Sequence, residues 1–190
     1  MMKDWETSMD AKVWMDKYAH PLLELISNYP KPIISAVNGI AFGGGCELNI
    51  LFDIVIAAND SIFSLPEGLI GALPPIGSSY GVALIGRQIG RYLLTGEWIS
   101  AEDARRIGIV DVVVPSDQMQ AAIVEFTGKL SNIAPLSAAA IKSSMNSVRR
   151  TFASNAIAAG NELLILASSE DFKHGQESFL RKRKPVWKGR

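Results

Sequence analysis

Three consecutive glycines, Gly43 to Gly45, are the feature that most restricts what this chain can fold into. They follow a short apolar run at residues 33–37 and the turn pair at residues 38–39, and they precede a segment that can form a short helix. Glycine lets a backbone turn sharply and approach a ligand closely, and the free N–H groups of a helix start attract negative charge. The pattern predicts a strand, a tight turn and a helix, with either a packing role or a ligand at the turn.

Apolar runs elsewhere extend this pattern into a fold class. Residues 53–58, 61–64 and 109–114 are predicted to be buried strands, and residues 68–77 a loop. The predicted helices are 8–27 (with a kink or break at Pro21), 46–52, 78–89, a helix starting at Ser100 and ending at Gly108, 117–133, 135–150 and 152–168. Strands lie in the first part and helices dominate the rest, so we expect an α/β protein with a helical C-terminal region.

Composition excludes several classes of protein. The 190 residues carry 19 Lys+Arg against 19 Asp+Glu, so no basic excess favours nucleic acid. No apolar run approaches the roughly 20 residues of a membrane-spanning helix, and the polar start does not look like a signal peptide. The single cysteine, Cys46, can form neither an intrachain disulfide nor a zinc site. We therefore expect a cytoplasmic protein without a metal, nucleic-acid or membrane partner, in which Cys46 is a packing residue.

Two glutamates are candidates for chemistry. Glu47 lies in the first turn of the helix after the glycines, and Glu67 follows a predicted strand. Each also has a simpler interpretation, Glu47 as an acid that complements the helix dipole and Glu67 as a solvated loop residue. If both share a pocket, their repulsion keeps one protonated while the other ionises, which supplies an acid and a base at neutral pH. The sequence alone does not show whether they meet.

The segment at residues 31–48, with its glycines and Glu47, closely resembles the core signature of the enoyl-CoA hydratase/isomerase (crotonase) superfamily. The similarity continues through residues 53–57, Pro66-Glu67, 94–96 and 108–110 to a tail at 178–185, so it covers nearly the whole chain. The resemblance implies a ClpP/crotonase spiral of short strands and helices. It places this core at residues 1–134, without the family's first N-terminal segment, and a helical oligomerisation region at residues 135–190.

The resemblance also implies a site. Gly44 matches a backbone donor of an oxyanion hole, and Glu47 and Glu67 match the pair that positions water and transfers protons. Both acids together favour hydration of a trans-2-enoyl-CoA, while a double-bond isomerase and a catalytically silent CoA-binding or assembly subunit stay open as alternatives. Coenzyme A belongs to the substrate, and no separate cofactor is implied. The implied substrate-binding residues are Ala41, Phe42, Gly43, Gly45, Leu65, Pro66, Pro75 and Lys184.

The family's C-terminal helices pack between subunits, so we expect a homotrimer or a dimer of trimers in which Leu163, Leu164 and Leu166 contact a neighbour. Two departures from the family pattern stand out. Residues 73–79 replace a Gly-rich stretch, which leaves acyl-chain length and reaction type open. The chain also starts where the family's second oxyanion donor should have ended. We expect a truncation, an internal start codon or a part supplied elsewhere, and little hydratase activity from the 190 residues alone.

Overall fold

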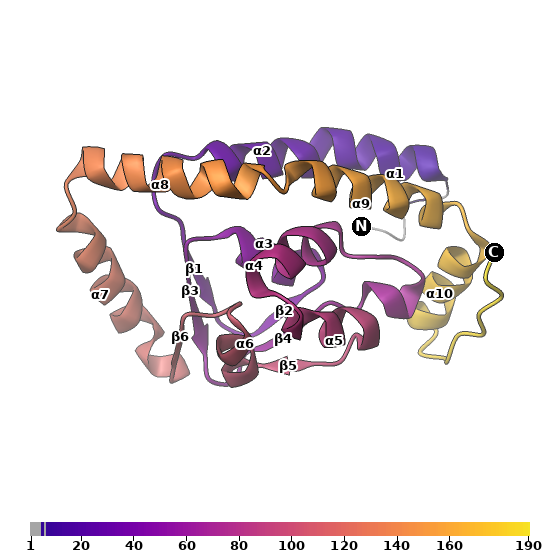
Figure 1. Ribbon diagram of the computed structural model, residues 1–190. Coiled ribbons are helices and arrows are strands. Elements are labelled where there is room, and N and C mark those ends of the chain that lie inside the picture. Colours follow the sequence, from indigo (N-terminus) through magenta and orange to yellow (C-terminus); the bar gives the residue numbers. More distant parts are fainter. Residues whose placement is uncertain (1–4, 6) are drawn as a thin grey trace.

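The computed structural model describes residue 5 and residues 7–190, and Figure 1 shows its arrangement. Two helical rows run side by side along the top, one from the start of the chain and one from its C-terminal part, and the strands lie below them. The first row is α1 (Ser8–Trp14), a π-helical turn (Met15–Ala19) and α2 (His20–Asn28), and the second is α8 (Pro135–Arg150) and α9 (Ala153–Ala167). None of the helices in the described part of the chain has the length and apolar character needed to span a membrane.

The strands form two small sheets. In the first, β1 (Ile34–Val37), β3 (Ile54–Ala58) and β6 (Val112–Val114) are parallel in the order β1-β3-β6. In the second, β2 (Ile40–Phe42) is parallel to β4 (Ile62–Ser64), and β4 is antiparallel to β5 (Ile99–Ser100). The chain alternates between the two sheets, because β1 leads into β2, a helix connects β2 to β3, and β3 leads into β4. The glycine turn therefore lies where β2 ends beside β4.

The remaining elements complete the core and the periphery. The glycine turn leads into α3 (Gly44–Leu51), and a short 3₁₀ turn, η3 (Glu67–Ile70), follows β4. Next come a π-helical turn (Gly77–Gly81), α4 (Val82–Ile85), α5 (Gln88–Thr95), α6 (Ala101–Ile107), a 3₁₀ turn (Ser116–Gln118), α7 (Met119–Ser131) and, after α9, α10 (Glu170–Leu180).

The first helical row shows why a proline does not always break a helix. A break or kink was predicted at Pro21, but the helix continues through the π-helical turn, and Pro21 is the second residue of α2. The regular α-helix is interrupted just before Pro21 by the π-helical turn, in which the His20 N–H bonds to the Met15 carbonyl. This irregular turn accommodates the residue that lacks an N–H group, and the helix is not ended.

Several predicted boundaries agree with the structure and others differ for physical reasons. Ser100 caps α6 by accepting a hydrogen bond from the Asp103 N–H, and Gly108 ends it with a left-handed φ of 94°. The strand predicted over 109–114 is shorter, because the N–H groups of Ile109 and Val110 bond back to the Ala104 carbonyl at the end of α6. The helix predicted over 78–89 is divided at Gly86, and β2, β5, α5 and α10 were not predicted.

The interior contains separate hydrophobic cores. The largest lies between the strands and α3, α5 and α6, and includes Val55, Phe63 and Leu65. A second core joins the first and last helices, with Trp5, Leu163 and Phe172 at its centre, and the Trp5 and Phe172 rings stack at 6.3 Å between centroids. A third, smaller core packs α7 on β3. The first two cores bring residues from distant parts of the sequence to a common boundary.

One buried ionic cluster attaches α8 to the sheet. The Asp53 carboxylate accepts hydrogen bonds from Lys142, from Arg149 (Nη1, 2.8 Å) and from the Ile33 N–H (2.8 Å), and the Lys142 side chain is only 2 % exposed. Burial by itself raises the pKa of Asp53, but these donors hold it below its ordinary value. The cluster fixes the second helical row against β1 and β3.

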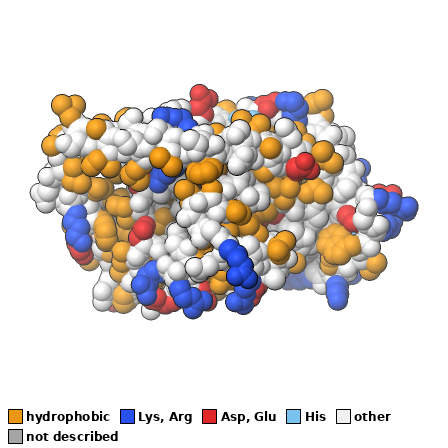
Figure 2. Space-filling view, viewed as in Figure 1, with side chains coloured by type: hydrophobic (Ala, Val, Ile, Leu, Met, Phe, Trp, Pro, Cys, Tyr) orange, Lys and Arg blue, Asp and Glu red, His pale blue; other side chains and the backbone are white. Residues whose placement is uncertain are grey.

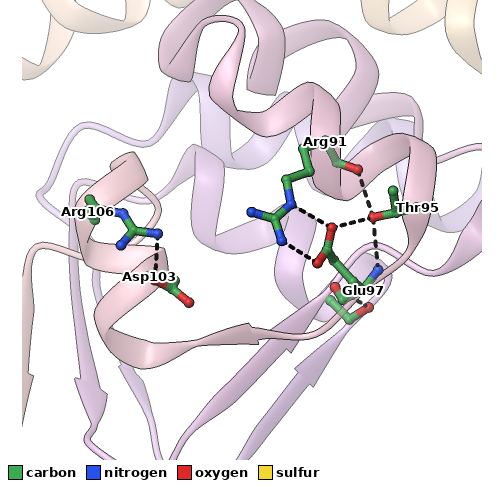
Figure 3. A network of polar contacts seen from close by, with 6 residues as sticks. Arg91, Thr95, Glu97, Asp103 and Arg106 are labelled. Carbon is green, nitrogen blue, oxygen red and sulfur yellow. Dashed lines mark hydrogen bonds and ion pairs between the residues drawn. The ribbon is translucent and has the colours of Figure 1, made fainter.

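In contrast to the buried Asp53 cluster, the charged side chains of α5 and α6 form ion pairs on the surface. On the face shown in Figure 2, Lys and Arg side chains gather along the lower edge, where α5 and α6 carry exposed arginines. Arg91 forms a bidentate ion pair with Glu97, which also contacts Thr95, and Arg106 pairs with Asp103 (Figure 3). These pairs are solvent-exposed and contribute little stability individually. Their structural value is local: the Arg91–Glu97 pair holds the turn that precedes β5, and the Arg106–Asp103 pair lies within α6.

Candidate active site

The glycine turn is fixed by backbone hydrogen bonds. Gly43 precedes α3 with a φ of 57°, its N–H donates to the Ser64 carbonyl (2.9 Å), and its own carbonyl accepts from the Glu47 N–H (2.9 Å). A β-carbon on Gly43 would lie 2.8 Å from Oε1 of Glu67. Only glycine therefore satisfies both the left-handed backbone and the close approach of that carboxylate. The turn leaves the N–H groups of Gly44 and Gly45 at the start of the helix, where they have no intrahelical acceptor.

The turn is braced from β4. The Ser64 hydroxyl donates to the Gly96 carbonyl (3.0 Å), and the Ser64 carbonyl receives the Gly43 N–H. Gly96 precedes Glu97, which is held by Arg91 and Thr95 in the polar network of Figure 3. The surface network thus fixes the segment that Ser64, and through it Gly43, rests on.

Glu47 is buried and firmly held. It is 6 % exposed, and its Oε1 accepts hydrogen bonds from the N–H groups of Ile76 (2.7 Å) and Gly77 (2.8 Å). Burial, and next the negative charge of Glu67, raise the pKa of Glu47 to about 8 against the opposing effect of the two N–H donors. The loop that contains Ile76 and Gly77 is therefore the element that orients this carboxylate.

Glu67 is equally buried but differs from Glu47 in its hydrogen bonding. It is the first residue of η3 and is also 6 % exposed, but its buried Oε2 has no hydrogen-bond partner. Burial raises the pKa of Glu67 to about 7. A buried carboxylate oxygen without a partner costs free energy, so such a group is typical of a functional site. With both pKa values near neutrality, the pair holds about one proton at neutral pH.

Both carboxylates line one cavity of about 420 Å³. The side formed around the glycine turn comprises Phe42, Gly44, Gly45, Glu47, Glu67 and Pro75, which we call the carboxylate wall. Trp5, Trp14, Leu73 and Leu163 belong to the second core and form what we call the apolar wall. Residues of the first helical row, including Met15 and Leu22, close the cavity further. The cavity thus lies where the first two cores meet.

The structure places the predicted site residues in three groups. Phe42, Gly44, Gly45, Pro75 and both glutamates line the cavity. Behind them, Ala41 and Leu65 are buried in the first core, Gly43 touches Glu67, and Pro66 precedes η3. Lys184 lies in the exposed segment after α10 and does not line this cavity.

Sequence reasoning missed the apolar wall as part of the site. Trp14 was not among the predicted site residues, and Leu163 was expected to contact a neighbouring subunit. Leu163 is instead 5 % exposed within its own chain, packed in the core that contains Trp5 and Phe172. Cys46, beside Glu47, is fully buried, and burial raises the pKa of its thiol to about 12. It therefore stays protonated, as a packing residue does.

The profile of the enoyl-CoA hydratase/isomerase family matches residues 2–190. The chain belongs to this family. Among its relatives, the 2,3-dehydroadipyl-CoA hydratase of Escherichia coli (strain K12) is 36% identical over 168 residues, which are 85% of this chain and 65% of the relative. The carnitinyl-CoA dehydratase of Salmonella typhi is 35% identical over 179 residues, 87% of this chain and 66% of the relative.

Solved structures agree with the fold. An enoyl-CoA hydratase/isomerase from Pseudoalteromonas atlantica T6c superposes with a TM-score of 0.81 at 25% identity, over 87% of this chain and 68% of that one. A carnitinyl-CoA hydratase from Mycobacterium avium gives 0.78 at 33% identity, over 87% and 66%. The predicted crotonase-like fold and family membership are confirmed. The chain spans about two thirds of the length of the curated relatives it matches.

Proposed function

We propose that this protein is an enoyl-CoA hydratase, which adds water across the trans-2 double bond of an acyl-CoA thioester. The observation that carries the proposal is the pair of buried carboxyl groups in one cavity, with pKa values raised to about 8 for Glu47 and about 7 for Glu67. One group holds a proton while the other is ionised, so an acid and a base are present together at neutral pH. Coenzyme A enters as part of the substrate, and the proposed reaction uses no further cofactor.

The glycine turn supplies the electrostatic part of the mechanism. Nucleophilic addition to an enoyl thioester places negative charge on its carbonyl oxygen, and a fixed N–H donor lowers the free energy of that charged state. The Gly43 N–H is already bonded to Ser64, while Gly44 is the first residue of α3 and lines the cavity. We assign the Gly44 N–H as a donor to the thioester oxygen, assisted by the positive end of the helix.

The carboxyl pair supplies the proton transfers. Oε1 of Glu47 is occupied by two N–H donors, which leaves its other oxygen and the unpaired Oε2 of Glu67 to hold a water molecule. The ionised carboxylate takes a proton from this water as the water oxygen bonds to the β-carbon and the π electrons move toward the thioester. The protonated carboxyl then gives its proton to the α-carbon. In the net reaction one O–H bond of water and the C=C π bond break, one C–O and one C–H bond form, and the pair keeps the same total number of protons.

A double-bond isomerase is the alternative within the same family. It moves one proton between two carbons of the substrate, for which a single carboxyl group is sufficient. Burying a second carboxylate, here held by the Ile76 and Gly77 N–H groups, costs free energy of folding. A reaction in which that second group activates water accounts for its presence. This supports hydration over isomerisation.

We further propose a cytoplasmic homotrimer, or a dimer of trimers, assembled through the region 135–190. An exposed apolar row on α8 supports this, because Ile141, Met145 and Val148 follow helical spacing and are 55 %, 39 % and 58 % exposed. Light scattering should show an oligomer that Met145→Asp dissociates, whereas Ser144→Asp on the same helix leaves it intact. A monomeric wild-type protein at micromolar concentration would refute this assembly.

The catalytic proposal is tested with the full gene product and crotonyl-CoA, whose absorbance falls when the conjugated double bond is hydrated. Glu47→Gln and Glu67→Gln should each lower kcat by about 10²–10⁴-fold, the usual size of general acid–base contributions. Glu102→Gln, the same change at an exposed ion pair with Arg105, should leave kcat unchanged. Wild-type activity in either cavity variant would show that the pair does not transfer protons.

A further inference from the structure

The cavity has a lining of unusual uniformity. Apart from the two glutamates, the described residues that line it carry only apolar side chains, glycine hydrogens or indole rings. Trp5 and Leu163 are 6 % and 5 % exposed, and the Trp5 and Trp14 rings lie 5.7 Å apart at 49°. No lysine, arginine or histidine is among these lining residues, and none has a hydroxyl or amide side chain. Any part of an acyl group beyond the carboxyl pair therefore meets apolar surface.

The cations on the neighbouring elements do not compensate. On the first helical row, Lys12 pairs with Asp16, and Lys17 lies over the exposed Tyr18 ring at 5.2 Å. Lys142 and Arg149 on α8 are bound to Asp53. These four cationic side chains are thus directed to other groups, and none of them lines the cavity. Among the described lining residues, the ionisable groups inside the cavity are those of the carboxyl pair.

We infer that this cavity selects acyl groups with an uncharged, apolar end and excludes those that end in a carboxylate. The inference rests on the proposed function and narrows its substrate class. A terminal carboxylate entering the cavity would lose its hydration, find no cation or hydroxyl donor, and be repelled by the carboxyl pair. An alkyl end would bury apolar surface against Trp5, Trp14 and Leu163. The protein thus differs in substrate charge from what the name of its Escherichia coli relative states, despite their 36% identity.

The direct test compares two substrates of equal chain length, trans-2-hexenoyl-CoA and 2,3-dehydroadipyl-CoA, with the full gene product. We expect kcat/KM to be on the order of 100-fold higher for the methyl-ended substrate, the scale set by burying an unpaired polar group. Equal rates, or a preference for the carboxylate, would overturn the inference.

A charge introduced into the wall gives a second, independent readout. Trp14 is only partly buried, so Trp14→Arg places a cation at the cavity, and Trp14→Gln, which removes the same ring without adding charge, is the control for the lost packing. Trp14→Arg should reduce the preference for the methyl-ended substrate by about 10-fold or more relative to Trp14→Gln, through pairing with the carboxylate. If both variants shift the preference equally, the wall does not discriminate by charge.

Binding separates this inference from the proposed function. Calorimetry with the unreactive hexanoyl-CoA and adipyl-CoA should show tighter binding of hexanoyl-CoA even if neither enoyl substrate is hydrated. Absence of hydration with this binding preference intact would refute the hydratase and leave the selectivity standing. Hydration without a binding or rate preference would support the hydratase and refute the selectivity. Failure of both thioesters to bind would also overturn the inference.

Discussion

The two walls of the cavity are built in different ways. The carboxylate wall comes from one short stretch of chain, in which β2, the glycine turn, α3 and the end of β4 place Gly44, Glu47 and Glu67. The apolar wall joins Trp5 and Trp14, near the start of the chain, to Leu163 on α9. The first depends on backbone hydrogen bonds of defined direction, and the second on nondirectional burial of large side chains. We conclude that local sequence encodes the chemistry, whereas packing of the two ends of the chain determines what the cavity accepts.

The largest expected effect concerns the buried ion cluster that attaches α8 to the sheet. Asp53→Asn would leave the buried Lys142 ammonium without a counter-charge, and loss of one partner of a buried ion pair costs about 3–5 kcal/mol. We expect the free energy of unfolding in urea to fall by this amount. Asp103→Asn, at the exposed pair with Arg106 in Figure 3, should cost less than about 1 kcal/mol. Similar losses in the two variants would mean that the cluster does not fasten α8 to the sheet.

A truncation in the apolar wall should affect stability and binding but not proton transfer. Leu163→Ala removes a side chain that is 5 % exposed, and such changes cost about 2–5 kcal/mol. We expect KM for hexenoyl-CoA to rise while the pH profile of kcat keeps its shape. Ile165→Ala, at a 65 % exposed position of the same helix, is the control and should change neither quantity. A displaced pH profile in Leu163→Ala would show that the walls are not independent.

A methyl group added at the glycine turn should lower kcat. In Gly43→Ala the new β-carbon meets Oε1 of Glu67 at a positive φ, so we expect about 1–3 kcal/mol of strain together with a marked loss of kcat. Gly39→Ala provides a matched control, because Gly39 also has a positive φ of 128° but its β-carbon would have no neighbour within 4 Å. It should lose comparable stability and keep its kcat. Equal kcat values in the two variants would separate Gly43 from the chemistry.

The last prediction concerns the pH dependence of stability. The pKa values of Glu67 and Glu47 rise from the ordinary 4.5 to about 7 and about 8 in the folded protein, so the folded state binds protons more tightly than the unfolded state. Their contribution to stability is fully present below pH 4.5 and is lost as the pH rises through 7 and 8. Urea unfolding between pH 5 and pH 8 should therefore show a steeper decline for the wild type than for the double variant Glu47→Gln/Glu67→Gln. Parallel curves would contradict the raised pKa values.

The contrast between local sequence and packing of distant segments also explains what could be predicted from the sequence. The glycine turn and the capped helix between Ser100 and Gly108 were predicted because each depends on residues close together in the chain. The pairing of the two glutamates, by contrast, was implied by the family resemblance. The two-residue strand β5 exists only through its pairing with β4, and no local pattern marks it. Likewise, nothing in the sequence around Leu163 indicates whether it meets Trp5 of its own chain or a second subunit. Pairing and packing between distant segments decide these features.

The position of the cavity between two cores has one more consequence. Each core is complete on its own, but the surfaces that face the cavity have no close-packed partner until it is filled. A bound acyl chain would join the cores, and a ligand at about 100 times its Kd adds about 2.7 kcal/mol by mass action. Protection of the α1 and α9 amides from hydrogen exchange should then grow with acyl-CoA concentration. The folded lifetime of the protein would thereby follow the supply of its own substrate.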